Sequence, residues 1–198
     1  WIHLFKDEYE KDENAMKLIL EIENDVERLK GVAERFGKIG SEPELSALSI
    51  EPVLDDVFNY LERRLPQLGR AVEVKKLLQT NASVRINREL FQWAVENLVK
   101  NAIDAMNSTK GKAVITIATR ETQASVHIDI SDTGAGIDPN NTKNVFRPGY
   151  STKKRGWGLG LSLTKRIIEE YHKGKVYVHH SELGKGTTMR IKLEKAEA

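Results

Sequence analysis

The chain has 198 residues, 39% of them hydrophobic, and a formal net charge of +2. This length and apolar content predict one domain of ordinary size plus an extra element, and the near-neutral charge gives no sign of a nucleic-acid partner. The sequence contains no cysteine, which excludes disulfides and thiolate metal sites. It also has no apolar run long enough to cross a membrane and no recognisable signal peptide, so we expect a cytoplasmic location.

Residues 12 to 37 predict one long helix, because apolar side chains recur with a period of about 3.5 residues. An isolated helix cannot bury such a stripe, so it needs a partner. The partner is either a second helix, in a hairpin that dimerises into a four-helix bundle, or the domain that follows. Gly37 to Pro43 predict a linker, which divides the chain into residues 1–40 and 41–198. The apolar stripe consists of Ala15, Ile19, Ile22, Val26, Leu29, Ala33 and Phe36.

The second part of the chain mixes helices and strands without a regular alternation. An amphipathic helix is predicted over 50–65, ending before Pro66, and two more lie over 91–106 and 163–171. This order favours an α+β fold, a two-layer sandwich with a mixed sheet and its helices on one face. Alternating apolar residues predict strands at 72–78, 82–86, 113–119, 125–131, 175–180 and 187–193, the third and fourth as an antiparallel pair.

Three histidines in this part have simple structural interpretations. His172 ends a predicted helix, where a cation interacts favourably with the helix dipole. His179 and His180 are adjacent in a predicted strand, so they are expected on opposite faces of the sheet.

The helix over 91–106 has a polar face beside its apolar stripe. Asn97, Asn101 and Asp104 fall on it about one turn apart. An amide oxygen can hold Mg²⁺, which usually keeps several waters and gains other ligands from substrate phosphates. The alternative is an ordinary solvated face.

Asp132 follows a strand pattern and precedes Gly134 and Gly136. A carboxylate at a strand end can accept hydrogen bonds from an exocyclic amine, and the glycines let the backbone approach a ring closely. A turn that needs a positive φ is the alternative explanation.

Gly156 to Leu161 form a glycine-rich segment directly before a predicted helix. Such a segment leaves backbone N–H groups and the positive end of the helix dipole free for a phosphate chain. Lys153, Lys154 and Arg155 precede it and could reach the same phosphates, although a single glycine-rich loop is weak evidence.

Taken in this order, the motifs resemble the catalytic ATP-binding domain of sensor histidine kinases, in the superfamily that includes gyrase, Hsp90 and MutL. The resemblance covers roughly residues 85 to 193 and implies the Bergerat ATP-binding fold for residues 41–198. Glu96 to Met106 resemble the N box of that family, Asp132 to Ile137 the G1 box, Phe146 to Lys153 the F box and Gly156 to Leu161 the G2 box, with Gly184 to Thr188 matching the glycine-threonine motif.

The resemblance implies a role for each matching position. At the adenine end, Asp132 would bind the amine, Gly134, Gly136 and Ile137 would shape the pocket, and Thr187 would lie below the ring. At the phosphate end, Asn101 would hold Mg²⁺, Lys100 would contact phosphate, and Asp104 would lie by the nucleotide. Phe146, Tyr150, Thr152, Lys153 and Arg155 would belong to a lid, and Gly158, Leu159, Gly160 and Leu161 would surround the phosphates.

Three positions depart from the family pattern. Trp157 stands where a small residue is common, and Ala105 where an aromatic residue often stacks on adenine. Hydrolytic relatives carry a glutamate that activates water four residues before the Mg²⁺ asparagine, and here that position is Asn97. An amide cannot act as a general base, so the site suits transfer to a presented nucleophile better than hydrolysis.

Arg35 to Gly40 resemble the end of the second helix of the dimerisation hairpin in the same family. The phosphate-accepting histidine of that hairpin lies on its first helix, in a box that this sequence lacks. His3 is the only histidine before the linker, and it has neither the acidic neighbour nor the proline of that box. We therefore expect a piece that can donate a phosphoryl group but cannot autophosphorylate.

The resemblance implies a protein-histidine kinase that uses ATP and Mg²⁺, with a histidine of the dimerisation domain and a response-regulator aspartate as successive acceptors. It also implies a homodimer in the full-length protein, and either a cytoplasmic protein or the cytoplasmic part of a membrane-bound sensor. Two alternatives remain. One is an ATPase or ATP-driven clamp of the gyrase and Hsp90 kind, and the other is a degenerate kinase domain that only binds.

Overall fold

The computed structural model describes residues 5–6, 9, 12, 14–16, 18–23, 26, 43–62, 71–107, 109–152 and 157–196. The chain divides into two compact units, Trp1–Pro43 and Glu44–Ala198. In the first unit, residues 14–16, 18–23 and 26 are helical and fall within the helix predicted over 12–37. Asp12, at the start of the predicted helix, is described and is not helical. The remaining residues of that helix, the linker residues Gly37 to Glu42, and His3 lie outside the described residues.

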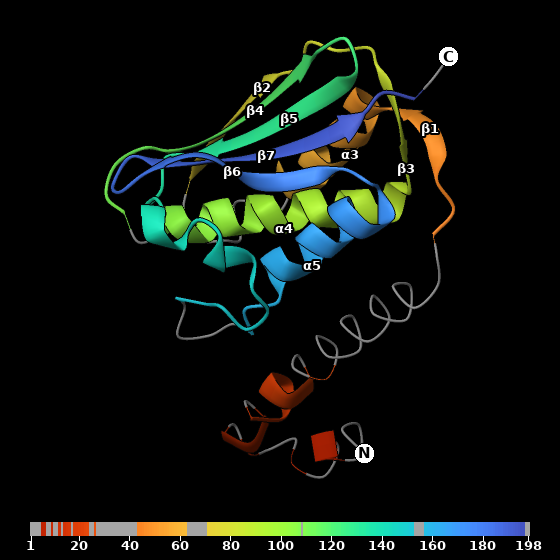
Figure 1. Ribbon diagram of the computed structural model, residues 1–198. Helices are drawn as coiled ribbons and strands as arrows, with labels where there is room; N and C mark the ends of the chain where they lie inside the picture. The colour runs from red at the N-terminus through yellow and green to blue at the C-terminus, as the bar shows by residue number, and fades with distance from the viewer. Residues whose placement is uncertain are drawn as a thin grey trace. The chain divides into compact units, whose positions relative to one another are not determined.

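The second unit is built on a mixed five-stranded sheet, as predicted (Figure 1). Only β2 and β4 are parallel; every other neighbouring pair is antiparallel. The sheet runs in the order β2 (Val72–Leu77), β4 (Ala113–Glu121), β5 (Ser125–Asp132), β7 (Gly186–Glu194) and β6 (Lys175–Glu182).

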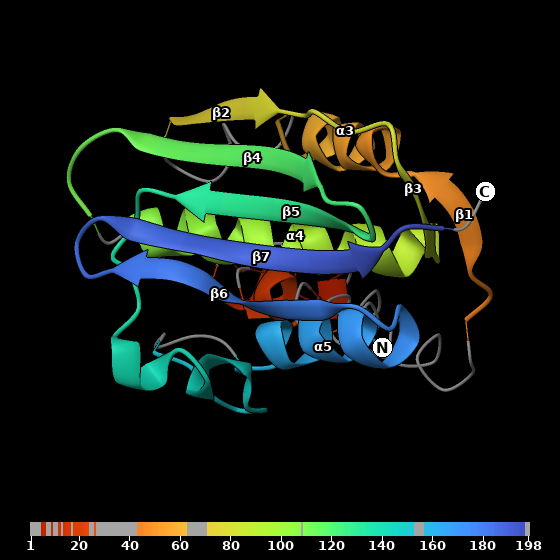
Figure 2. The same ribbon diagram turned by 45° about the horizontal axis from the view of Figure 1, so that its top comes forward.

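The helices of this unit lie on one face of the sheet (Figures 1 and 2). They are α3 (Ile50–Glu62), α4 (Arg88–Asn107) and α5 (Gly160–Arg166), the last continuing into the π-helix η4 (Ile167–Tyr171). The predicted α+β sandwich with helices on one face is therefore confirmed. None of the helices in the described part of the chain is long and apolar enough to cross a membrane.

The core lies between the two layers. Along β4, Ala113, Ile115 and Ile117 are buried, and the residues between them are half-buried. Val126, Ile128 and Ile130 of β5 and Ile191 of β7 continue this inner face, against which α4 packs with Leu90, Phe91, Val95, Leu98 and Ile103. The other face of the sheet is consequently left to polar side chains.

A second, two-stranded sheet joins β1 (Ser46–Ser49) to β3 (Ser83–Ile86) in antiparallel register. The alternation of apolar residues did not predict β1, because only four residues form this strand and its side chains are largely exposed. Two 3₁₀-helices, η2 (Pro139–Asn141) and η3 (Asn144–Phe146), precede the lid.

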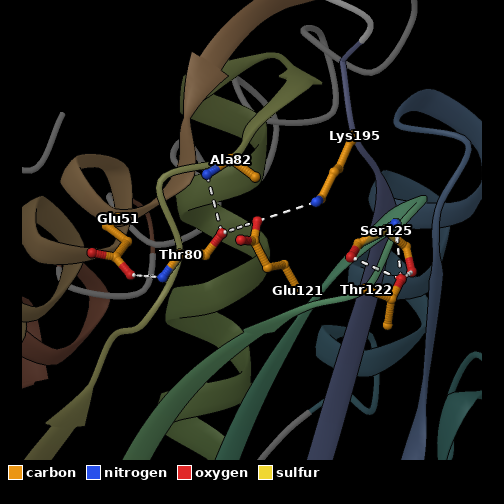
Figure 3. A network of polar contacts seen from close by, with 7 residues as sticks. All are labelled: Glu51, Thr80, Ala82, Glu121, Thr122, Ser125 and Lys195. Carbon is orange, nitrogen blue, oxygen red and sulfur yellow. Dashed lines mark hydrogen bonds and ion pairs between the residues drawn. The ribbon is translucent and has the colours of Figure 1, made fainter.

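A polar network closes the end of the domain at which β4 finishes (Figure 3). The backbone N–H of Thr80 donates to Glu51, and its hydroxyl donates to Glu121 at 3.0 Å and accepts from Ala82 N–H. Lys195 pairs with the same Glu121 carboxylate at 3.2 Å. The network thus links α3, the connection from β2 to β3, β4 and the segment after β7.

His172 is buried and does not act as the predicted helix-ending cation. Its Nε2 accepts a hydrogen bond from Asn87 N–H at 3.0 Å, and its Nδ1 donates to the Ile167 carbonyl at 2.8 Å. Only a neutral ring can make both bonds. Burial lowers the pKa of His172, in keeping with that form.

The prediction that His179 and His180 point to opposite faces is also wrong. An irregularity in pairing between Val178 and His180 shifts the register of β6 by one residue. His180 then pairs with Thr188, and His179 packs edge-on against Tyr177 with ring centroids 6.4 Å apart. A bulge of this kind brings both histidines to the outer face of the sheet.

Candidate functional site

Asp132 is the last residue of β5, and its carboxylate lies at one end of the site. Gly134 N–H donates to its Oδ1 at 2.7 Å, and Thr187 N–H donates to the same carboxylate. Burial raises the pKa of Asp132 to about 6, although these two N–H donors act in the opposite direction. Asp132 is therefore mainly ionised at pH 7.5 and retains acceptor capacity for a further donor.

The glycine segment after Asp132 passes between α4 and the hairpin of β6 and β7. A Cβ added to Gly134 would lie 2.8 Å from Ala105, and Gly136 has a φ of 76° with its Cα facing the Glu182 carbonyl. Ala135 bonds to both sides, since its N–H donates to Ala105 O at 3.1 Å and its carbonyl accepts from Gly184 N–H at 2.8 Å. Only glycine fits these two close approaches.

Thr187 belongs to a small hydroxyl pair beneath this segment. Its Oγ1 lies 2.9 Å from Ser181 Oγ, which accepts from Ile137 N–H at 2.8 Å. Ser181 was missed by the sequence analysis. Ser181 can be recognised as a site residue because it is polar, faces inward on β6 and pairs with Thr187, but this pairing is known only once the strand register is known.

The opposite end of the site lies on the polar face of α4. A Cβ added to Gly160, the first residue of α5, would lie 3.9 Å from both Asn97 Oδ1 and Asn101 Nδ2. Asn97 Nδ2 is buried and makes no hydrogen bond with the described residues. The start of α5 therefore faces both amides, and one of them carries a buried donor without a partner among the described residues. Lys100 is exposed and Asp104 is half-buried.

A clasp of two glycines closes the base of the lid. Gly149 N–H donates to the Gly158 carbonyl at 3.1 Å, and a Cβ added to Gly158, whose φ is 65°, would lie 2.5 Å from the Gly149 carbonyl carbon. Phe146 is buried just before the clasp, whereas Trp157 is 67% exposed. Tyr150, Leu159 and Leu161 are half-buried and Thr152 is exposed, while Lys153 and Arg155 lie outside the described residues.

The two ends of the site are separated along one helix. Ala105, beside the Asp132 segment, and Asn97, beside Gly160, are eight residues apart on α4, or about 12 Å at 1.5 Å per residue. The site therefore suits an elongated ligand with a hydrogen-bond donor at one end and an anionic group at the other. Among the described residues, no cluster of three or more histidine or acidic side chains could hold a metal ion by itself.

Comparison with known proteins places this arrangement in a family. Residues 86–197 match the family described as histidine kinase-, DNA gyrase B-, and HSP90-like ATPase. Sporulation kinase C of Bacillus subtilis (strain 168) is 40% identical over 97 residues, which are 49% of this chain and 22% of that protein. The chain spans about a fifth of the length of the first curated relatives it matches.

Two solved structures show the same fold. The nucleotide-free catalytic domain of histidine kinase ThkA superimposes with a TM-score of 0.67 at 24% identity, covering 78% of this chain and all of that one. ThkA in complex with the response regulator protein TrrA gives a TM-score of 0.73 at 22% identity, covering 98% of this chain and 57% of that one. The predicted likeness to the catalytic domain of sensor histidine kinases is confirmed, and the chain belongs to the family of histidine kinase-, DNA gyrase B- and HSP90-like ATPases.

Proposed function

We propose that the chain binds Mg²⁺-ATP between α4 and the lid and transfers the γ-phosphoryl group to a histidine on a dimerisation domain. The observation that carries this proposal is the approach of Gly160 to Asn97 and Asn101 in the middle of α4, and of Gly134 to Ala105 and Asp132 near its C-terminal end. The intervening distance of about 12 Å suits a nucleotide lying along the helix.

At the adenine end, the ionised Asp132 accepts a hydrogen bond from the exocyclic amine. Its two backbone donors, Gly134 and Thr187, hold the carboxylate in place and leave its other lone pairs for the ligand. Gly136 and Ile137 keep the backbone close to the ring, with Thr187 below it. Ala105 offers a methyl group and no aromatic ring, so adenine recognition rests chiefly on the Asp132 hydrogen bond and the flanking backbone.

At the phosphate end, the unpaired Nδ2 group of Asn97 and the first backbone N–H groups of α5 supply hydrogen bonds to the phosphate chain. Asn101 would hold Mg²⁺ through its amide oxygen, with Asp104 nearby and Lys100 reaching the phosphates from the exposed side. Mg²⁺, when bound, neutralises charge on the phosphoryl oxygens. Phe146, Tyr150, Thr152, Lys153, Arg155, Gly158, Leu159 and Leu161 complete the enclosure as the lid and its base.

Asn97 favours transfer over hydrolysis. An amide does not take a proton from water, so the side chain cannot generate a hydroxide nucleophile beside the γ-phosphate. It can orient a phosphate oxygen while a presented imidazole attacks. The histidine would come from a dimerisation hairpin with the helix of residues 12–37 as its second half, in a homodimer of the full-length protein.

The proposed path continues to a receiver domain. The relative ThkA has been crystallised with a response regulator, and the fold similarity to that protein supports the same class of partner here. We place the working site of this catalytic unit in the cytoplasm, where ATP and receiver domains are available.

The test uses the chain with γ-labelled ATP, Mg²⁺ and an N-terminally extended copy that carries a histidine box and the Asp132→Asn substitution. Acid-labile, alkali-stable label on the extended copy is the expected result, and the unsubstituted chain would be its source because the Asp132→Asn copy binds ATP much more weakly. Free labelled phosphate without protein label would instead indicate an ATPase. If neither copy is labelled and ATP is unchanged, trans transfer by this catalytic unit is refuted.

A further inference from the structure

The face of the sheet away from the helices is turned toward the viewer in Figure 2. The strand register places a row of four basic residues across this outer face. Strand register places Arg120 of β4 beside His127 of β5, His127 beside Lys192 of β7, and Lys192 beside Lys175 of β6. We call these four residues the basic row.

The side chains of the basic row point away from the core. Their neighbours along the strands are buried on the inner face: Thr119 before Arg120, Leu193 after Lys192 and Val176 after Lys175. Arg120, Lys175 and Lys192 are exposed and His127 is half-buried. Within the described part of the chain, none of the three permanent cations forms an ion pair.

Like charges placed directly opposite one another on a sheet destabilise it, so the Lys192 and Lys175 pair within the basic row is an unfavourable local choice. Elsewhere on the same face a cation is neutralised by an opposite charge on the adjacent strand, because Arg190 of β7 donates two hydrogen bonds of 2.6 and 2.7 Å to Asp129 of β5. The basic row has no such partner across it. Its acidic neighbour on the same face, Glu194, lies at the end of β7 opposite Ser125.

Two nearby cations add to the effect of burial on the pKa of His127. Burial, then Arg190 and Lys192, lower the pKa of His127, while Asp129 acts in the opposite direction. A site that breaks a local rule without compensation inside the fold is a candidate for function.

We propose that the basic row docks a helix of a partner protein that carries a stripe of acidic side chains. Neighbouring strands lie about 4.8 Å apart, so the row is about 14 Å long. Acidic residues at positions i, i+3, i+7 and i+10 of a helix span about 15 Å and match it. Four same-face residues of an extended segment span about 20 Å and do not.

An anionic membrane is a weaker fit than an acidic helix. Stable electrostatic attachment to lipid generally uses clusters of four to eight lysine or arginine residues, and the row supplies three. Beside the row lie Ala118, the Asp129 and Arg190 pair, and Tyr177, none of which forms an apolar wedge for insertion.

The test measures binding of a stapled helical peptide with glutamates at i, i+3, i+7 and i+10, by fluorescence anisotropy on the whole chain. The test variant is Arg120→Gln, Lys175→Gln and Lys192→Gln together. A matched control, Lys110→Gln, Lys143→Gln and Lys165→Gln, removes the same charge from exposed sites outside this sheet face. ATP affinity, unchanged in both, reports that each variant is folded and keeps the result independent of the proposed function.

The expected result is about a tenfold loss of peptide affinity in the test variant and less than twofold in the control. Equal losses in the two variants would overturn the proposal, since net charge alone would then explain binding. It would also be overturned if an extended peptide with alternating glutamates, or vesicles of 30% phosphatidylserine, bound the row more tightly than the helix. Absence of helix binding by the unsubstituted chain would overturn it as well.

Discussion

The ring of His172 accepts a hydrogen bond from the backbone N–H of Asn87, 3.0 Å away, and so ties the end of the π-helix η4 to the start of α4. Asn87 in turn caps α4, because its Oδ1 accepts from Leu90 N–H at 3.1 Å. Phe91, one turn into α4, packs edge-on against the same imidazole. Helix α4 and helix α5, which flank the phosphate end of the site, are thus connected by one neutral histidine at the ends that lie away from the site.

Replacing His172 with alanine should destabilise the domain by about 1–3 kcal/mol, because two buried hydrogen bonds are lost and a backbone N–H is left unpaired. The stability of the unsubstituted chain should also depend on pH through this residue. The pKa of folded His172 lies below its ordinary value, so its contribution is present above about pH 6.5 and is lost as the pH falls.

Urea unfolding at pH 7.5 and pH 5.5 measures both effects. Other groups, such as Asp132, titrate in both proteins, so the difference between the unsubstituted chain and His172→Ala isolates the histidine. That difference should shrink at pH 5.5. A difference that grows on acidification would mean that His172 is charged in the fold.

Asp132 predicts a pH dependence of nucleotide binding. Its pKa of about 6 in the folded chain means that the carboxylate is protonated at lower pH and must lose that proton to accept the adenine amine. ATP affinity should therefore fall below pH 6, by up to about tenfold per pH unit. Asp132→Asn should bind ATP about 10–100-fold more weakly at pH 7.5, since a hydrogen bond to a charged group is lost.

Isothermal titration calorimetry across pH 5 to 8 with both proteins tests this prediction. Titration of the ATP phosphates affects the two proteins alike, so the ratio of their affinities is the informative quantity. A constant ratio would show that Asp132 is not the titrating acceptor.

The glycine clasp gives a steric prediction. Gly149 and Gly158 both have positive φ values, 81° and 65°, yet only at Gly158 would an added Cβ meet other atoms within 4 Å. Gly158→Ala should therefore separate the two ends of the lid and weaken ATP binding, whereas Gly149→Ala introduces comparable backbone strain without the clash. We expect at least about a tenfold larger loss of affinity for Gly158→Ala, measured by nucleotide titration. Similar losses in both variants would point to backbone strain alone.

Asn97 predicts the balance between transfer and hydrolysis. Asn97→Glu places a general base four residues before Asn101, so steady-state phosphate release should rise while phosphoryl transfer to the extended copy falls. Asn97→Gln is the matched control, because it has the same length and no base. Equal phosphate release by the two variants would show that the residue at this position does not decide the reaction.

Alternation and helical spacing sufficed for the sheet and the helices, since strands such as β7 bury Met189, Ile191 and Leu193 at every second position. The features that escaped prediction depend on contacts between distant segments. β1 is a strand because β3 pairs with it, and Ser181 joins the site because the register of β6 faces it to Thr187. The bulge at His179 reverses a side-chain direction that strict alternation would have fixed, and His172 is kept neutral by its burial between distant segments of the chain.

The isolated bridge between Val84 and Lys195 has a consequence for synthesis in the cell. More than half of the chain separates these two residues, and Lys195 also makes the ion pair with Glu121 that completes the polar network. On the ribosome, α3, β3 and α4 emerge long before their last partners do. Ala196 N–H also donates to the Ser83 carbonyl at 2.8 Å. The domain therefore cannot close until residues 195 and 196 have left the exit tunnel, and a nascent chain arrested just short of them should remain open to protease.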